Sequence, residues 1–262
     1  MSYARKDVIG DCTLYLGDCL EVMPGLGKVS HVITDPPYES YMHKSKEASA
    51  RRIRLDGRAE LKCLDFESID SIRKPMIDQT VGISDGWALY FCAPEGVGRY
   101  ADVINQSPAK YKRACVWVKP DSTPQLNGQG PAMGSESFVV AWCGKGFARW
   151  NAGGKRGVYT HLTNPPNRHG RHPTEKPVSL MREILTDFTN AGETVLDPFM
   201  GSGTTGVACV QLQRKFIGIE LDPKYFDIAC TRIEEAYRQP QLFPAEKPKP
   251  AQTRDMFEEG AA

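Results

Sequence analysis

Several common features are missing from this 262-residue chain, and each absence excludes a class of protein. No apolar run reaches the length that crosses a membrane, and residues 1–7 lack the apolar core of a secretory signal. The eight cysteines are scattered without a Cys-x-x-Cys pair, which predicts neither a disulfide framework nor a zinc site. We therefore expect a cytoplasmic protein without a membrane anchor or a metal, in which the cysteines are reduced and buried.

A strong overall charge is also missing, because the formal net charge is only +1. The positive residues are nevertheless clustered. Residues 145–182 hold eight basic side chains and one acid, and residues 39–62 hold seven basic side chains and four acids. Two basic segments on a nearly neutral chain predict one face that contacts phosphate groups, although a solvated charged surface is the alternative reading. The candidate contacts are Arg51, Arg52, Arg54, Lys155, Arg156, Arg168 and Arg171.

Strand-like and helix-like segments alternate along the chain. The expected strands are residues 13–16, 29–34, 87–92, 113–119, 137–143, 194–197 and 215–221. Apolar residues at helical spacing predict one helix within residues 176–190 and another that begins at Asp222-Pro223. This alternation predicts an α/β fold with a doubly wound, mostly parallel sheet, and residues 113–143 are expected to form an antiparallel hairpin at the sheet edge.

The domain prediction is equally simple. We expect one catalytic domain over residues 1–238, with a basic loop or insertion at residues 39–66. Residues 144–171 are rich in Gly, Asn, Pro and Arg, so they are expected to lack regular structure and to recognise the target. The tail, residues 239–262, is rich in Pro, Lys and Glu and is expected to be disordered.

A short motif, Asp35-Pro36-Pro37-Tyr38, directly follows the apolar run at residues 29–34. The carboxyl ends of strands are where open α/β sheets bind their ligands. The two prolines give a stiff turn with free carbonyl oxygens. A carboxylate and a fixed carbonyl can together accept both protons of an exocyclic amine, and a tyrosine can stack on the base that carries it. The motif therefore favours chemistry at an amino group of a nucleic-acid base.

A second motif, residues 197–206, follows a predicted strand and opens a helix. Gly201, Gly203 and Gly206 match the Gly-x-Gly-x-x-Gly pattern, and Glu220 ends the next strand, where its carboxylate can hold ribose hydroxyls. The segment predicts a cofactor that contains adenosine without saying which one. A nicotinamide-dependent oxidoreductase is thus one alternative, although it leaves the first motif unexplained.

Together, Asp-Pro-Pro-Tyr and Asp-Pro-Phe-x-Gly-Ser-Gly-Thr-Thr resemble the DNA amino-methyltransferases that use S-adenosylmethionine, and the order of the motifs resembles the permuted β class of that family. Gly17-Asp18-Cys19, Lys119 and the segment 172–177 also resemble family motifs. The resemblance implies a Rossmann-like methyltransferase fold with a seven-stranded sheet.

The resemblance also implies a role for each matching residue. Asp35 and the Pro36 carbonyl would accept hydrogen bonds from the target amine, with Pro37 in the same turn, and Tyr38 would stack on the flipped base. Asp18 would bind the adenine of the cofactor and Glu220 its ribose. The other implied cofactor residues are Asp197, Phe199, Gly201, Gly203, Thr204, Thr174 and Lys176.

Elementary chemistry supports this assignment of roles. The nitrogen of an aromatic amine shares its lone pair with the ring and is a poor nucleophile. Two acceptors on its protons favour a pyramidal nitrogen, and a carboxylate stabilises the positive charge that develops there. The sulfonium methyl of the donor is already electrophilic, so catalysis mainly requires positioning. Inside a duplex the amine is paired, which means that the base must be extruded.

The target base and the partners remain open at this level. In the family that the chain resembles, aspartate at the first motif position is commoner among enzymes that act on N6 of adenine, so we expect that target, with N4 of cytosine as the alternative. A DNA-binding protein without catalysis is a further alternative. Double-stranded DNA is the expected partner, and relatives in the β class often form homodimers. Residues 239–243 also resemble the short Gln-x-x-Leu-Phe peptides that dock on bacterial sliding clamps.

Overall fold

The computed structural model of the chain describes residues 2–38, 69–123, 130–163 and 175–239. The predicted basic loop at residues 39–66 lies outside these ranges, as does the predicted tail except for Gln239. None of the helices within these ranges is both long and apolar enough to cross a membrane. The seven cysteines in the described ranges are free, and all of them except the partly exposed Cys143 are buried.

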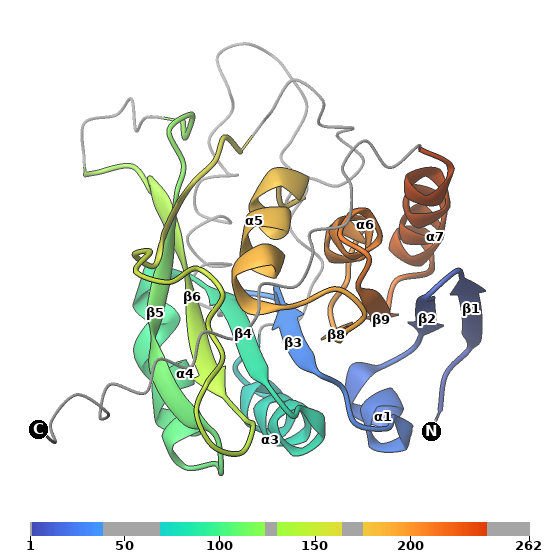
Figure 1. Cartoon of the computed structure of the whole chain (residues 1–262), viewed down its shortest axis with the longest axis horizontal. Coiled ribbons are helices and arrows are strands. Elements are labelled where there is room, and N and C mark those ends of the chain that lie inside the picture. The colour runs from blue at the N-terminus through green and yellow to red at the C-terminus, as the bar shows by residue number, and fades with distance from the viewer. Residues whose placement is uncertain (1, 39–68, 124–129, 164–174, 240–262) are drawn as a thin grey trace, which may run out of the picture.

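One nine-stranded sheet runs through the described part of the chain, in the order β1-β2-β9-β8-β3-β4-β6-β5-β7 (Figure 1). The strands are β1 (Arg5–Ile9), β2 (Cys12–Leu16), β3 (His31–Thr34), β4 (Trp87–Cys92), β5 (Lys110–Val118), β6 (Ser135–Trp142), β7 (Val158–Thr160), β8 (Thr194–Asp197) and β9 (Lys215–Glu220). The prediction of seven strands was therefore wrong. Strand β1 was missed because it lies at the sheet edge and is mostly exposed, so its sequence has no apolar run.

The predicted hairpin exists, but it does not lie at the edge of the sheet. Strands β5 and β6 pair antiparallel, with Trp117 opposite Glu136, and β6 also pairs antiparallel with β4. The short strand β7 pairs parallel with β5 and takes the outer position. The expectation that residues 144–171 lack regular structure was wrong at these three residues, which are too few to give a recognisable sequence pattern.

Helices cover both faces of the sheet, as the doubly wound arrangement requires (Figure 1). One face carries α1 (Cys19–Val22), α3 (Arg73–Ile83) and α4 (Val97–Asn105), and the other carries α5 (Val178–Phe188), α6 (Thr204–Gln211) and α7 (Pro223–Arg238). Helix α7 begins as predicted, because the Asp222 carboxylate accepts hydrogen bonds from the backbone N–H groups of Lys224 and Tyr225.

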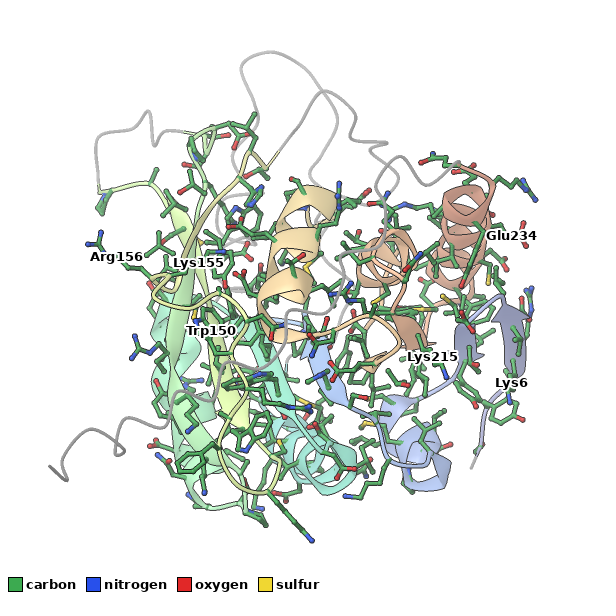
Figure 2. The ribbon with its side chains drawn as sticks, in the orientation of Figure 1. Lys6, Trp150, Lys155, Arg156, Lys215 and Glu234 are labelled. Carbon is green, nitrogen blue, oxygen red and sulfur yellow. The ribbon has the colours of Figure 1, made fainter. Side chains whose placement is uncertain are left out.

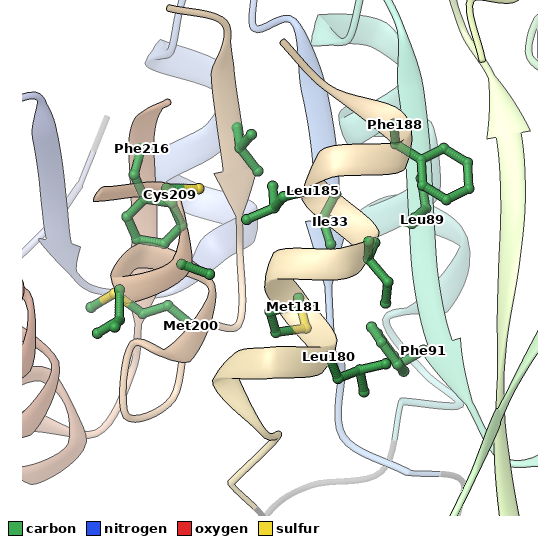
Figure 3. Close-up of a cluster of buried hydrophobic side chains, with 14 of the residues drawn as sticks. Ile33, Leu89, Phe91, Leu180, Met181, Leu185, Phe188, Met200, Cys209 and Phe216 are labelled. Carbon is green, nitrogen blue, oxygen red and sulfur yellow. The ribbon is translucent and has the colours of Figure 1, made fainter. Parts of the chain in front are cut away.

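The larger apolar cluster lies between the sheet and helices α5 to α7. Ile33, Leu89 and Phe91 point from the central strands toward Leu180 and Leu185 of α5 (Figure 3). These five side chains are at most 1% exposed. At about 25 cal/mol for each Å² of apolar surface removed from water, such burial fixes α5 against the sheet. The residues that precede α5 are thereby held at the carboxyl edge of the strands.

The sheet is joined in the middle by a short contact between β3 and β8. Only His31 and Val32 have register partners there, namely Val195 and Leu196. Side chains reinforce this join, because the Thr34 hydroxyl donates to Asp197 Oδ1 over 2.7 Å. We call this contact the central seam. It brings the ends of two strands that are more than 160 residues apart in the sequence to neighbouring positions.

Candidate active site

A cavity of about 400 Å³ opens at the carboxyl ends of the central strands. Both sequence motifs line it, so the two segments that sequence analysis singled out meet in one place. The turn after β3 contributes residues 35–38, and the turn after β8 contributes most of residues 197–205. Asp18, Lys176 and Glu220 complete the predicted part of the lining. The location agrees with the rule that open α/β sheets bind ligands at this edge.

Asp35 presents two unlike oxygens. Its Oδ2 accepts a hydrogen bond of 2.6 Å from Lys176 Nζ. Its Oδ1 is buried and has no hydrogen-bond partner among the described residues. Burial raises the pKa of Asp35, and Lys176 opposes that rise. A buried acceptor without a partner costs about 1–3 kcal/mol, so Oδ1 is a place where an N–H group from a ligand would be stabilised.

Lys176 does not project into open space. Its Nζ atom lies 3.0 Å from Glu136 Oε2 as well as bonding to Asp35. The same atom lies 5.1 Å from the ring centroid of Phe91 and 5.8 Å from that of Tyr38, within the range of cation–π attraction. Burial alone would lower the pKa of Lys176, but the two carboxylates outweigh it and raise the pKa well above its ordinary value. The residue is therefore a fixed cation.

Glu136 was not singled out in the sequence, although it lies at the centre of this group of charges. It accepts a hydrogen bond from Lys119 Nζ and makes a side-chain hydrogen bond with Tyr38. Burial alone would raise the pKa of Glu136, but Lys176 and Lys119 lower it to about 2. The signal in the sequence was an acid at the start of an apolar strand. Because β6 runs antiparallel to β4, its start lies at the same edge of the sheet as the ends of the parallel strands, where the cavity opens.

The turn between β8 and α6 has the open backbone that its glycines predict. Gly201 has φ +51° and faces open space. Gly203 has φ +80°, and a Cβ atom there would lie 2.9 Å from Ala229 Cβ, so this glycine allows α7 to approach rather than lining the cavity. Glu220 Oε2 accepts a hydrogen bond of 2.9 Å from the Gly201 N–H, which ties the end of β9 to the turn.

Asp197 is a fixed part of the structure under the cavity. Its Oδ1 accepts from the Thr34 hydroxyl over 2.7 Å and from the Phe199 N–H over 3.1 Å. Its Oδ2 accepts from the Thr205 hydroxyl over 2.7 Å. Burial raises the pKa of Asp197 to about 6, although the two hydroxyls lower it in part. Because protein donors bind both oxygens, this carboxylate holds together the central seam and the start of α6.

A buried ion pair fixes two lining segments to each other, and sequence analysis missed it. Arg232 of α7 donates to Glu175 Oε1 over 2.6 Å and to the Ser202 carbonyl over 2.6 Å. The side chains of Arg232 and Glu175 are only 3% and 4% exposed. The signal was an arginine at i+3 from Ala229 on the apolar face of α7. This pair links the glycine turn to the segment that carries Lys176.

The remaining predicted residues fall into three groups. Asp18 lines the cavity and caps α1 by accepting from the Leu20 N–H, and Phe199 and Thr204 also line the cavity. Lys155 and Arg156 lie beside β5 (Figure 2), where Lys155 Nζ pairs with Glu183 over 2.7 Å and with Asp187. The residues outside the described ranges are Arg51, Arg52, Arg54, Arg168, Arg171 and Thr174.

Comparisons with known proteins agree on one family. The model of the N6_N4_Mtase family, described as DNA methylase, matches residues 29–231. The chain is 29% identical to the type II methyltransferase M.Cfr9I of Citrobacter freundii over 86% of this chain and 89% of that protein. It is 41% identical to the DNA adenine methyltransferase YhdJ of Escherichia coli (strain K12) over 27% of this chain and 24% of that protein. The crystal structure of an M1.HpyAVI–SAM complex matches with a TM-score of 0.65 and 27% identity, over 85% of this chain and 98% of that one.

Proposed function

This chain belongs to the DNA methylase family, and from that premise we propose that it methylates N6 of adenine in a base extruded from double-stranded DNA. The protein is an S-adenosylmethionine-dependent DNA methyltransferase. One observation carries the finer proposal about its base site. Asp35 Oδ1 is a buried acceptor without a partner among the described residues, and it belongs to a side chain that lines the cavity.

The residues of the cavity fit S-adenosylmethionine. Glu220 lies at the end of β9, where a carboxylate can accept hydrogen bonds from ribose hydroxyls, and the open backbone at Gly201 allows a ligand to approach closely. Asp18 and Phe199 supply a polar group and an aromatic ring for the adenosine portion. When it is bound, the cofactor supplies an electrophilic methyl group on a sulfonium centre.

The side chains of the first motif then act on the target amine. Asp35 Oδ1 and the Pro36 carbonyl accept its two N–H groups, which favours a pyramidal and more nucleophilic nitrogen. As positive charge develops there, Asp35 stabilises it and accepts the proton that the amine releases. Lys176 keeps Oδ2 occupied, so that a single oxygen of the carboxylate faces the amine. Tyr38 stacks on the extruded base, which is worth about 1–3 kcal/mol.

Adenine is the favoured target, and N4 of cytosine is the second candidate. The adenine proposal rests on the aspartate at the first motif position and on the similarity to the adenine methyltransferase YhdJ. The family model covers both kinds of enzyme by its name, so the alternative keeps a specific basis. The basic residues assigned to DNA contact remain predictions, and Lys155 is the weakest of them because two acids already neutralise it.

One experiment tests both the chemistry and the target base. Duplex DNA is incubated with the protein and the methyl donor, and modification-sensitive sequencing then identifies the methylated base and its context. We expect N6-methyladenine with the native chain and a loss of at least 100-fold in the rate with Asp35→Asn, because asparagine carries no charge to stabilise the amine. Cofactor affinity, measured by calorimetry, should change by less than about threefold. Full turnover by the variant would refute the proposed role of Asp35. If the product is N4-methylcytosine, the target is N4 of cytosine and not N6 of adenine.

Four further predictions extend the proposal beyond the chemistry of the cavity. Residues 144–171 and 39–66 are proposed to recognise the DNA sequence, and the short length of both predicts a short or relaxed site. Homodimerisation and docking of residues 239–243 on a sliding clamp remain predictions. The compartment proposed for the protein is the cytoplasm, where its DNA substrate would be found.

A further inference from the structure

We propose that Glu136 is a positioning residue for the base site, holding Tyr38 and Lys176 in fixed places relative to Asp35. This inference rests on the proposed function, because it assumes that the turn at residues 35–38 receives the base. Glu136 itself does not line the cavity. Its effect on the reaction would therefore be transmitted through the two side chains that it holds.

The contacts of Glu136 connect it to each element of the site. Its Oε1 accepts a hydrogen bond from Lys119, and its Oε2 lies 3.0 Å from Lys176 Nζ. Its carboxylate also hydrogen-bonds with the Tyr38 side chain. The side chain is only 8% exposed, so these interactions are made out of water and are stronger than at a surface.

The backbone explains why Glu136 can hold the others. It lies in β6, where pairing with Trp117 of β5 fixes its Cα atom within the sheet. Tyr38, by contrast, lies four residues beyond the end of β3, and its backbone carbonyl accepts a long hydrogen bond of 3.4 Å from the Ile69 N–H. A stacking ring on a turn needs an anchor on a rigid element if it is to meet the base at one angle.

The charges in this group also balance, and the balance determines where Lys176 lies. Two lysines face two carboxylates, and Lys176 is shared between Asp35 and Glu136. Without the charge of Glu136, Asp35 would be the one carboxylate left beside the Lys176 ammonium, which would move toward the second oxygen of Asp35. That oxygen is the acceptor that the proposal reserves for the amine, so loss of Glu136 would both release Tyr38 and obstruct Asp35.

The test compares Glu136→Gln and Glu136→Asp with a variant of its partner, Tyr38→Phe. Glutamine keeps the size of the side chain but not its charge, and we expect kcat to fall about 10- to 100-fold. The KM for S-adenosylmethionine should stay within about threefold, because Glu220, Asp18 and Phe199, which are proposed to bind the cofactor, are untouched. Aspartate keeps the charge and should recover part of kcat. Phenylalanine at position 38 keeps the ring and removes the hydroxyl that bonds to Glu136.

The double variant Glu136→Gln with Tyr38→Phe separates positioning from general support of the fold. If Glu136 acts in part through the Tyr38 hydroxyl, the fold-loss of kcat in the double variant should be smaller than the product of the two single fold-losses. Multiplying losses, or turnover of Glu136→Gln at the native rate, would overturn the inference. If Glu136→Gln does not fold, the cycle is run with Glu136→Asp and the same two outcomes apply. Failure of the proposed function itself would appear separately, as full turnover by Asp35→Asn.

Discussion

Replacing Arg232 by methionine should destabilise the protein and weaken cofactor binding at the same time. The guanidinium donates to Glu175 Oε1, the Ser202 carbonyl, the Ser202 hydroxyl and the Thr204 hydroxyl over distances of 2.6–3.2 Å. Because both ionic partners are less than 5% exposed, methionine would leave the Glu175 carboxylate buried without its cation. Breaking a buried pair on one side costs about 3–5 kcal/mol, which is a large part of the 5–15 kcal/mol that typically separates a folded domain from its unfolded state.

The assay is urea denaturation followed by circular dichroism, together with calorimetric titration of S-adenosylmethionine. We expect the free energy of unfolding to fall by about 3–5 kcal/mol for Arg232→Met. Adding Glu175→Gln should restore part of that loss, because no buried charge is then left unpaired. Cofactor affinity should fall about tenfold in both variants, since the Ser202 turn has lost its anchor. A loss below about 1 kcal/mol, or a double variant less stable than the single one, would refute the reasoning.

Three further predictions concern the cofactor side of the cavity. Gly203→Ala should destabilise more than Gly201→Ala: both glycines have positive φ, at a cost of about 1–2 kcal/mol for alanine, but a Cβ at residue 203 also lies 2.9 Å from Ala229 Cβ. Equal losses in the free energy of unfolding, measured by urea denaturation, would contradict the expected clash at residue 203. For Asp197, burial raises the folded pKa from 3.8 to about 6, so its contribution to stability is present below pH 4 and is lost as the pH rises through 6. The stability of the native chain relative to Asp197→Asn should thus fall by about 2 kcal/mol between pH 4 and 7, and a constant difference would be inconsistent with the raised pKa. Glu220→Gln should weaken the binding of S-adenosylhomocysteine about tenfold through lost ribose hydrogen bonds, and unchanged calorimetric affinity would remove the predicted ribose role.

The parts of the fold that could be predicted are those where local pattern and burial agree. The central strands are continuous apolar runs because helices cover both of their faces, and they were found from the sequence. Helix α3 was missed because Pro75 and Gly82 look like breakers, whereas Pro75 lies in the first turn of the helix, where no N–H is needed. Strands β1 and β7 were missed for lack of buried residues, because only Tyr159 among their eight residues is buried.

The candidate site divides in the same way. Turns whose residues have unusual backbone requirements, such as Asp35-Pro36-Pro37-Tyr38 and the glycine segment, can be recognised locally. The local signals at Glu136 and Arg232 mark a buried charge but not its role, since each acts through residues that are distant in the sequence and adjacent only in the folded chain. Lys176 and Asp35 were both found, but their bond was not anticipated, because they are 141 residues apart in the sequence.

The central seam has a consequence for the geometry of methyl transfer. Asp35 follows β3 and the glycine turn follows β8, so the group that receives the base and the group that receives the donor belong to opposite halves of the sheet. The backbone joins these halves through two register pairs, His31 with Val195 and Val32 with Leu196. The separation between nucleophile and methyl carbon would thus depend on a strand pairing of only two register pairs. Substitutions that loosen this join could slow turnover without touching either ligand.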